Sequence, residues 1–122
     1  IYGVGITPRK LEAVASLNAA GAQVKVITDD VDAARAIAAD GRMDALVEVD
    51  CGEHRGGVEP ADTLAVARAL GGSFAGIFTH AGHSYAGRSL AQMAEVAEAE
   101  RAAVVRAADA LRAAGLAPRI VS

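Results

Sequence analysis

Two periods of apolar residues alternate along this chain of 122 residues. Short runs rich in Val, Ile, Leu and Ala, bounded by turn residues, predict about five buried strands. Longer segments with apolar residues at helical spacing predict four helices between them. The expected strands cover residues 1–5, 23–28, 45–50, 73–79 and those after Pro118; the expected helices cover residues 7–20, 31–40, 60–71 and 89–115.

Cap and stop residues support these helix boundaries. Thr7–Pro8 is a favourable start for the first helix, and Gly21 fits its end. Asp29–Asp30 supplies a cap for the second helix, which Gly41 closes. Ser89–Gln92 has the spacing of a capping box and predicts the start of the long last helix.

Strict alternation of strands and helices predicts an α/β fold with a parallel sheet, because right-handed crossovers order such units side by side. A doubly wound sheet and part of a (β/α)8 barrel both satisfy the pattern. No G-x-G-x-x-G follows the first strand, and Glu48 and Asp50 share one face of a strand while Val47 and Val49 share the other. A polar lumen near a barrel mouth explains that alternation, so we expect residues 1–122 to be a partial (β/α)8 barrel.

Composition narrows the class of protein. The net charge of −3 argues against a nucleic-acid partner, and no apolar run approaches the roughly 20 residues that span a bilayer. No signal-peptide pattern opens the chain and its one cysteine excludes an internal disulfide, so we expect a cytoplasmic protein. The chain begins without Met and ends in a strand-like run, which suggests a segment of a longer protein.

Two strand ends carry most of the chemically informative residues. The first motif, residues 47–57, reads Val-Glu-Val-Asp-Cys-Gly-Glu-His-Arg-Gly-Gly. The second motif, residues 74–85, reads Phe-Ala-Gly-Ile-Phe-Thr-His-Ala-Gly-His-Ser-Tyr. Because ligands bind at the carboxyl ends of parallel strands, the two motifs predict one site.

Arg55 is the strongest candidate in the first motif. It lies in a loop with three glycines, where the backbone can approach a ligand and a guanidinium can bind an anionic oxygen. A solvated loop arginine is the alternative. Cys51 and His54 would supply only two ligands of a zinc site, and a buried, inert cysteine is the better interpretation.

His80 and the turn after it are the candidates in the second motif. By alternation His80 shares a face with Phe74, Gly76 and Phe78, and a contact with Asp50 on the neighbouring strand is possible. A purely structural histidine is the alternative. Residues 82–85 could be an ordinary polar turn, and no G-x-S-x-G elbow surrounds Ser84 to suggest a hydrolase.

The two motifs together resemble the pyridoxal-phosphate enzymes of the alanine-racemase barrel type, in particular their D-serine dehydratase and D-threonine aldolase branch. Gly-His-Ser-Tyr at residues 82–85 is similar to that branch's Gly-x-Ser/Thr-Tyr segment. The first motif is similar to the family run Glu-x-Asp-x-Gly-x-x-Arg-x-Gly-Val, here Glu48, Asp50, Gly52, Arg55, Gly57 and Val58.

The resemblance implies a role for each candidate. Arg55 would contact the phenolate oxygen of pyridoxal 5'-phosphate, His80 would stack on its pyridine ring, and Tyr85 would reach the cofactor. Asp50 and His83 are weaker candidates for cofactor binding.

The resemblance also implies what lies outside this segment. Such enzymes hold the cofactor through a lysine, and neither Lys10 nor Lys25 sits at the end of an expected strand. We therefore expect no catalytic residue and no metal ligand here, and an inactive segment when isolated. The lysine, the phosphate-binding loop and a divalent metal, zinc or manganese, would belong to other parts of a homodimeric protein, including a C-terminal β domain.

The implied function is a metal-activated lyase acting on D-amino acids with a β-hydroxyl group. An amino-acid racemase or a non-catalytic pyridoxal-phosphate protein on the same barrel is the nearest alternative. A free-standing flavodoxin-like binding domain is an alternative of another class.

Overall fold

The parallel sheet is the centre of the computed structural model, which describes residue 1 and residues 3–122. Its strands lie in the order β1-β2-β3-β4, and every pair is parallel. This arrangement confirms the predicted α/β class. The strands are β1 (Val26–Thr28), β2 (Ala45–Val49), β3 (Phe74–Thr79) and β4 (Ile120–Val121).

The strand expected over residues 1–5 is reduced to a single bridge. Gly5 forms an isolated parallel bridge with Ile27, and the Ile6 amide donates to the Ile27 carbonyl at 2.9 Å. Tyr2 lies outside the described residues. The prediction of five strands is therefore wrong for the described part of the chain, which has four; the exposed Ile1 and Val4 show that this segment is not packed as a buried strand.

The four expected helices are present: α1 (Leu11–Ala19), α2 (Val31–Asp40), α3 (Thr63–Leu70) and α4 (Leu90–Ala113). Three short 3₁₀ turns accompany them: η1 (Pro8–Lys10), η2 (Gly71–Ser73) and η3 (Gly82–Ala86). Although α4 has 24 residues, neither it nor any other described helix is apolar and long enough to cross a membrane.

The caps predicted at Asp30 and Ser89 form, the second with one shift of partner, whereas Thr7 makes no side-chain cap at the start of the first helical segment. The Asp30 carboxylate accepts the Ala33 amide at 2.7 Å, and Gly41 ends α2 in the left-handed conformation at φ 68°. The Ser89 hydroxyl accepts the Gln92 amide at 3.2 Å. The Gln92 side chain accepts from the Arg88 amide at 2.8 Å, so the reciprocal bond of the capping box reaches one residue further back than expected.

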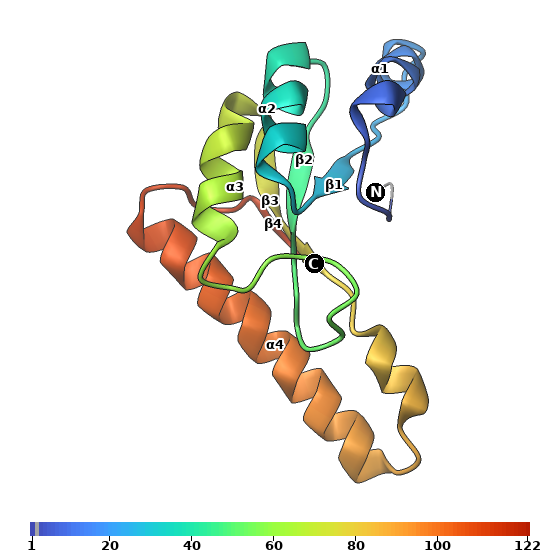
Figure 1. The fold of residues 1–122 in the computed structure, drawn as a ribbon, viewed down its shortest axis with the longest axis vertical. Helices are drawn as coiled ribbons and strands as arrows, with labels where there is room; N and C mark the ends of the chain where they lie inside the picture. The colour runs from blue at the N-terminus through green and yellow to red at the C-terminus, as the bar shows by residue number, and fades with distance from the viewer. Residues whose placement is uncertain (2) are drawn as a thin grey trace.

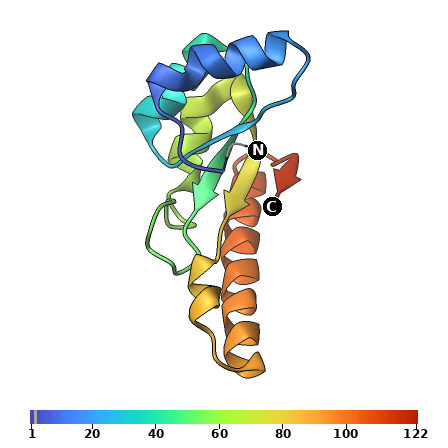
Figure 2. The same cartoon turned by 90° about the vertical axis from the view of Figure 1, so that its right-hand side faces the viewer.

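Helices α2, α3 and α4 cover one face of the sheet, and α1 lies beyond β1 (Figure 1). The core between these layers is aliphatic, which agrees with the low aromatic content of 3%. The first half of α4 and η3 project past the carboxyl edge of the sheet (Figure 2). Fully buried side chains of this core include Val26, Ile37, Val47, Val66, Leu70, Ile77 and Leu111.

The opposite face of the sheet carries a smaller apolar cluster. It consists of Ile27, Leu46 and Ala75, with Phe78 and Ile120 packed against them. In a closed barrel this face points to the packed lumen, and ligands bind where the lumen opens at the carboxyl ends of the strands.

A register shift between β2 and β3 overturns one expectation about this face. Ala45 pairs with Phe74, but Leu46 pairs with Gly76, so one extra residue of β3 is inserted there. As a result Phe74 packs with the helix-side core and Phe78 with the opposite cluster. The prediction that Phe74 shares a face with Phe78 is wrong, because a bulge breaks simple alternation. A Cβ on Gly76 would also collide with the backbone of Ile120.

Candidate functional site

The two motifs meet at the carboxyl edge of the sheet, as the sequence predicts. Val49 at the end of β2 pairs with Thr79 at the end of β3. The Thr79 hydroxyl donates a buried hydrogen bond to the Val49 carbonyl at 2.7 Å. This bond fixes the point at which both strands give way to their loops.

The loop of the first motif closes on its own strand. The Asp50 amide donates to the Val58 carbonyl at 2.8 Å, and the Val58 amide donates to the Glu48 carbonyl at 3.0 Å. Closure brings Gly57 against the strand: it has φ +91°, and a Cβ there would lie 2.7 Å from the Asp50 nitrogen. Only glycine fits this position without a shift of the backbone.

Asp29 clamps the same loop from β1. Its carboxylate accepts the Gly57 amide at 2.8 Å, whereas Asp30 alone caps α2. The sequence suggested a capping role for the Asp29–Asp30 pair and missed the clamp. A helix cap needs only one acidic residue, so the second one at this strand end was the signal for another role.

Contacts across the edge join the loop to the second motif. A Glu53 carboxylate oxygen accepts the Gly82 amide at 3.2 Å. The buried Cys51 thiol lies 3.6 Å from the His80 carbonyl and donates to it. Cys51 is therefore a buried cysteine that packs at the strand ends, the interpretation that the sequence favours.

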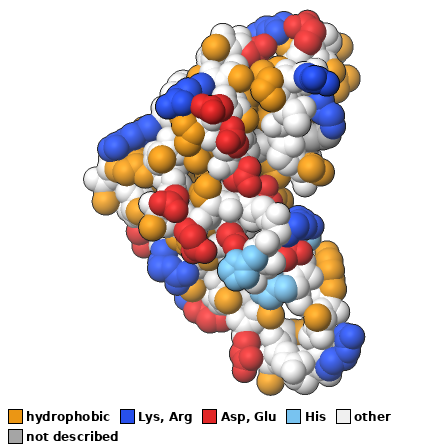
Figure 3. Space-filling view, viewed as in Figure 1, with side chains coloured by type: hydrophobic (Ala, Val, Ile, Leu, Met, Phe, Trp, Pro, Cys, Tyr) orange, Lys and Arg blue, Asp and Glu red, His pale blue; other side chains and the backbone are white. Residues whose placement is uncertain are grey.

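Arg55 reaches out of this loop over the lumen-side edge. Its side chain is 59% exposed, and its Nη1 lies 3.9 Å from Glu53 Oε1. It shares an open hollow of about 560 Å³ with Asp29, Glu48 and Gly56. Figure 3 shows histidine and acidic side chains gathered on the surface at this level of the molecule.

His80 and Tyr85 lie together at the end of β3. Their ring centroids are 6.1 Å apart and the rings are tilted by 60°. Tyr85 is 77% exposed, while His80 is half-buried. His83 in η3 is also half-buried, and its Nδ1 is buried without a hydrogen-bond partner in the described structure.

Asp50 does not make the expected contact with His80. Its carboxylate accepts the Gly52 amide at 2.8 Å and the His54 amide at 3.1 Å, and it lies 2.6 Å from His54 Nδ1. Burial opposes ionisation of Asp50, but these hydrogen bonds hold the pKa of the carboxyl below its usual value. The prediction of an Asp50–His80 contact is wrong because the loop turns Asp50 back onto its own backbone.

The Asp50 side chain lies on the helix side of the edge, so the prediction that it shares a face with Glu48 is wrong. It lines a hollow of about 320 Å³ with His54, Glu59 and residues of α4, including Arg106. Asp50, His54 and Glu59 each bring one potential ligand atom within 4.8 Å of the others. Hydrogen bonds between Asp50 and His54 hold two of these three residues together, and Arg106 lines the same hollow.

Glu48 is the acidic residue that faces the other candidates. Glu48 lines the same hollow as Asp29 and Arg55, and the residue is only 9% exposed. Burial, and then the nearby Asp29, raise the pKa of the Glu48 carboxyl, while Arg55 and His80 act in the opposite direction. From the sequence, Glu48 counts as evidence for a barrel strand and is not predicted as a site residue.

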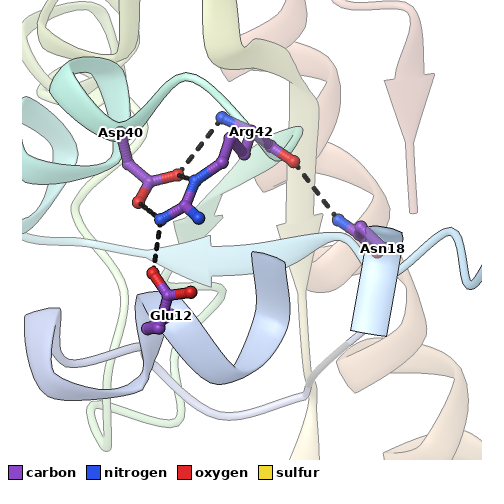
Figure 4. Close-up of polar contacts among 4 residues, drawn as sticks. All are labelled: Glu12, Asn18, Asp40 and Arg42. Carbon is purple, nitrogen blue, oxygen red and sulfur yellow. Dashed lines mark hydrogen bonds and ion pairs between the residues drawn. The ribbon is translucent and has the colours of Figure 1, made fainter. Parts of the chain in front are cut away.

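The amino edge of the sheet holds a hollow of about 700 Å³, away from the residues of the two motifs. Lys25 lines it and lies 3.5 Å from Asp44, so this amine is paired at the edge opposite the two motifs. Beside it, the Arg42 guanidinium contacts Asp40 and Glu12 at 2.7 Å each (Figure 4). Asn18 joins this network through the Arg42 carbonyl at 3.5 Å.

The parallel sheet, the helices on one face and the ligand-type loops at the carboxyl edge define a piece of a βα barrel. The family comparison specifies which barrel: the chain belongs to the alanine racemase, N-terminal domain, family, whose model matches residues 5–122. Structural neighbours of the same kind decide between the two folds that the sequence left open, in favour of the barrel.

Three relatives show the range of the similarity. The chain is 41% identical to D-threo-3-hydroxyaspartate dehydratase of Delftia sp. (strain HT23), over all of this chain and 35% of the enzyme. The structure of that dehydratase superposes with a TM-score of 0.91 at 40% identity, over 98% of this chain and 34% of that one.

Two further structures match more distantly in sequence. An alanine racemase-like protein from Idiomarina loihiensis has a TM-score of 0.92 at 34% identity, over 97% of this chain and 34% of that one. D-threonine aldolase from Filomicrobium marinum has a TM-score of 0.80 at 28% identity, over 95% of this chain and 34% of the aldolase chain. The chain thus spans about a third of the length of these relatives.

Proposed function

We propose that the full-length protein carrying this chain is a pyridoxal-phosphate-dependent lyase acting on D-amino acids with a β-hydroxyl group. The observation that supports this most is the 41% identity to a D-threo-3-hydroxyaspartate dehydratase along the whole chain. The structural similarity to a D-threonine aldolase points to the same substrate class. Dehydratase and aldolase activities are the two forms of the proposal.

The residues at the carboxyl edge fit the cofactor. A flat, anionic pyridine ring needs a cation for its phenolate oxygen and planar side chains against its face. Arg55 offers an exposed guanidinium, and the half-buried His80 lies beside the exposed Tyr85 with ring centroids 6.1 Å apart. The loop glycines let the backbone come close without a Cβ in the way.

Each residue would have a separate task. Arg55 would donate hydrogen bonds to the phenolate oxygen and keep it ionised, His80 would stack on the ring, and Tyr85 would contact the cofactor from η3. His83 is a weaker candidate contact through its unpartnered Nδ1. Asp50 would act only indirectly, because its carboxylate already accepts three hydrogen bonds within its loop.

The cofactor would supply the chemistry that these side chains lack. When bound, pyridoxal phosphate delocalises the electron pair left on Cα when a bond to that carbon breaks. The chain's own residues would orient the ring and exclude water from one side of it. The lysine that anchors the cofactor would come from another part of the protein.

We also propose a divalent metal, zinc or manganese, bound outside this chain, and a homodimer as the working form. A cysteine variant of the related dehydratase has been described in a metal-free form, which supports a metal in that enzyme. A metal ion would polarise the β-hydroxyl of the substrate as a Lewis acid. Residues 1–122 would then be the central part of the cofactor-binding barrel.

A racemase, or a protein that binds the cofactor without catalysis, is the second candidate. The similarity to the racemase-like protein from Idiomarina loihiensis supports this second candidate. The Gly-His-Ser-Tyr turn at residues 82–85 favours the lyase over this second candidate, because it resembles the segment of the D-serine branch.

The test uses the purified full-length protein with pyridoxal phosphate. We expect a visible absorbance band from bound cofactor, and turnover of D-threo-3-hydroxyaspartate, D-serine or D-threonine but not of their L-enantiomers. Ammonia with a 2-oxo acid would identify a dehydratase, and glycine with an aldehyde an aldolase. Inversion of D-alanine without either product would make the racemase the correct assignment, and no cofactor band would reject the proposal.

A further inference from the structure

One acid in the loop of Arg55 reaches across to the turn that carries Tyr85. Glu53 stands at a position that the family run Glu-x-Asp-x-Gly-x-x-Arg leaves open, so the resemblance assigns it no role. Its Oε2 accepts the Gly82 amide at 3.2 Å, from a residue 29 positions further along the chain. The Glu53 side chain is only 21% exposed. This contact therefore joins the loops of the two motifs, beyond the strands that already pair.

The Gly82 amide needs this acceptor. Gly82 is the first residue of η3 and is buried, and the amides that open a helix have no partner within it. Ala81, the residue before it, brings no side-chain cap. A buried amide without an acceptor costs free energy, so a carboxylate from the other motif takes the place of a local cap.

The fit between Glu53 and Gly82 is close. A Cβ on Gly82 would collide with the Glu53 carboxylate, so glycine leaves the room that the acid occupies. Beside this contact, a Cβ on Gly52 would be 3.9 Å from His83 Nε2. Loop and turn therefore meet at two successive residues of each motif.

The placement of Tyr85 depends on the backbone of η3. Tyr85 is 77% exposed, so packing does little to hold its side chain. In a 3₁₀ helix, residues three apart lie on the same side, so Tyr85 lies one turn along from Gly82. The Arg88 guanidinium donates to the Tyr85 carbonyl at 3.4 Å, a contact within three residues of the chain. The hydrogen bond at Gly82, in contrast, ties the turn to the other motif.

We propose that Glu53 is a positioning residue for Tyr85: its carboxylate locks η3 to the loop of Arg55 and so sets the separation of two predicted cofactor contacts. The inference rests on the proposed function only for its consequence, a cofactor site held in place before the ligand arrives. Glu53 Oε1 lies 3.9 Å from Arg55 Nη1, a long contact with an exposed side chain that contributes little. The hydrogen bond to Gly82 therefore carries the role.

The experiment compares Glu53→Ala, Glu53→Gln and the control Glu59→Ala in the full-length protein. Glu53→Ala removes the acceptor and the charge, whereas Glu53→Gln keeps an oxygen that can accept the Gly82 amide. Glu59 is exposed and lines the hollow on the helix side, so its variant removes an acid near the loop without touching Gly82. Gly82→Ala approaches the same contact from the other side, because the added methyl group would displace the Glu53 carboxylate.

The first readout is hydrogen exchange of residues 81–87 in the cofactor-free protein, measured by mass spectrometry of peptides. We expect Glu53→Ala and Gly82→Ala to exchange about tenfold faster than the parent protein in this segment, the effect of losing one hydrogen bond to a charged acceptor. Glu53→Gln and Glu59→Ala should stay close to the parent rate. Exchange in Glu53→Ala equal to that in Glu59→Ala would overturn the inference.

The second readout is the dissociation constant of pyridoxal phosphate in a double-mutant cycle with Tyr85→Ala. We expect Glu53→Ala alone to weaken binding by about tenfold, and by about twofold or less when Tyr85 is already replaced, because effects of residues that act through one another do not add. A loss of the same size with and without Tyr85 would indicate a general structural effect, and it would also overturn the inference.

Failure of the proposed function gives a different result. If the parent protein binds no pyridoxal phosphate, the proposed function is wrong, while the exchange rates still decide whether Glu53 holds η3. Circular dichroism confirms that each variant is folded, and Glu53→Gln keeps the size of the side chain.

Discussion

Two arginines at opposite edges of the same sheet differ in how far the protein itself uses their charge. At the amino edge, Arg42 bonds Asp40 and Glu12 at 2.7 Å each. At the carboxyl edge, Arg55 has its recorded carboxylate contact at 3.9 Å, to Glu53, and faces an open hollow. The donors of Arg42 are used within the protein, whereas those of Arg55 are available to a ligand.

The loops around the two arginines differ in whether side chains or backbone groups hold them together. Asn18 ties the amino edge together by accepting the Val24 amide at 2.8 Å, beside the Arg42 network. The carboxyl edge is held by backbone closures and by Asp29, which leave the side chains of Arg55 and Tyr85 exposed. A loop backbone held in place before a ligand arrives lowers the ordering cost of binding.

The largest expected effect comes from filling the tight loop at the carboxyl edge. Gly57→Ala would place a Cβ 2.7 Å from the Asp50 nitrogen at φ +91°, so we expect a loss of about 3 kcal/mol in the free energy of unfolding. Gly21→Ala, at φ +97° with nothing within 4 Å, carries the backbone strain alone and should lose about 1 kcal/mol. Urea unfolding of the full-length protein measures both; equal losses would contradict the crowding seen at Gly57.

Exchanging the two arginines for alanine should separate binding from stability. Under the proposed function, Arg55→Ala should weaken pyridoxal-phosphate binding by about 10- to 100-fold, with little change in the unfolding midpoint. Arg42→Ala should lower the midpoint and leave cofactor affinity unchanged, because its partners are all at the amino edge. Absorbance titration measures the cofactor affinity of each variant, and thermal unfolding measures its midpoint. An equal loss of affinity in both variants would contradict the predicted difference between the two arginines.

A smaller effect is expected from the hydrogen bond that joins the two motifs. Thr79→Val removes the 2.7 Å bond to the Val49 carbonyl without changing the shape of the side chain, and should cost about 1 kcal/mol. Asn18→Ala removes the corresponding bond at the amino edge. Only Thr79→Val should also weaken cofactor binding, because His80 follows it directly; chemical unfolding and absorbance titration compare the pair.

The smallest effect is an opposite pH dependence at the two edges. The hydrogen bond from Arg42 lowers the pKa of Asp40 below 3.8, so its stabilisation is present above that pH and is lost as the pH falls through the lowered value. Burial raises the pKa of Glu48 above 4.5, so stability is lost as the pH rises through the raised value.

Two variants make this difference visible in unfolding free energies between pH 3 and pH 8. Asp40→Asn should be less stable than the parent protein at neutral pH, with the gap closing in acid. Glu48→Gln should be more stable than the parent at neutral pH, with the gap narrowing as the pH falls toward 4.5. Gaps of the same sign would show that the two edges do not differ as described.

The sequence predicted much of the fold because helix caps, glycine stops and apolar periods are local signals. Asp30, Gly41 and Ser89 occupy the cap positions that they predict. The motifs were also visible, since strands β2 and β3 end where Asp50 and His80 follow. The strand predicted over residues 1–5 does not form in the described part of the chain. Its apolar residues match a strand pattern, but a strand also needs continuous pairing with a neighbour, and of the described residues in this segment only Gly5 pairs, with Ile27.

The site was only partly predictable, for the same physical reason. Residue type and position single out Arg55 and His80, and the family resemblance adds Tyr85. All three follow the carboxyl ends of β2 and β3, and their contacts with a cofactor stay a prediction. The orientation of Asp50 and the place of Asp29 could not be predicted, because both depend on a loop that closes through contacts between distant residues.

The amino-acid sequence by itself determined the four helices, the four strands after residue 22, their parallel pairing and the residue types at the strand ends. Only the tertiary structure decided which side chains face each other: the bulge that turns Phe74 to the helix side, the hydrogen bonds that turn Asp50 away from His80, and the placement of Glu48 beneath the Arg55 loop. Periodicity is encoded within a few residues, whereas register and loop closure are set by packing between residues far apart in the chain.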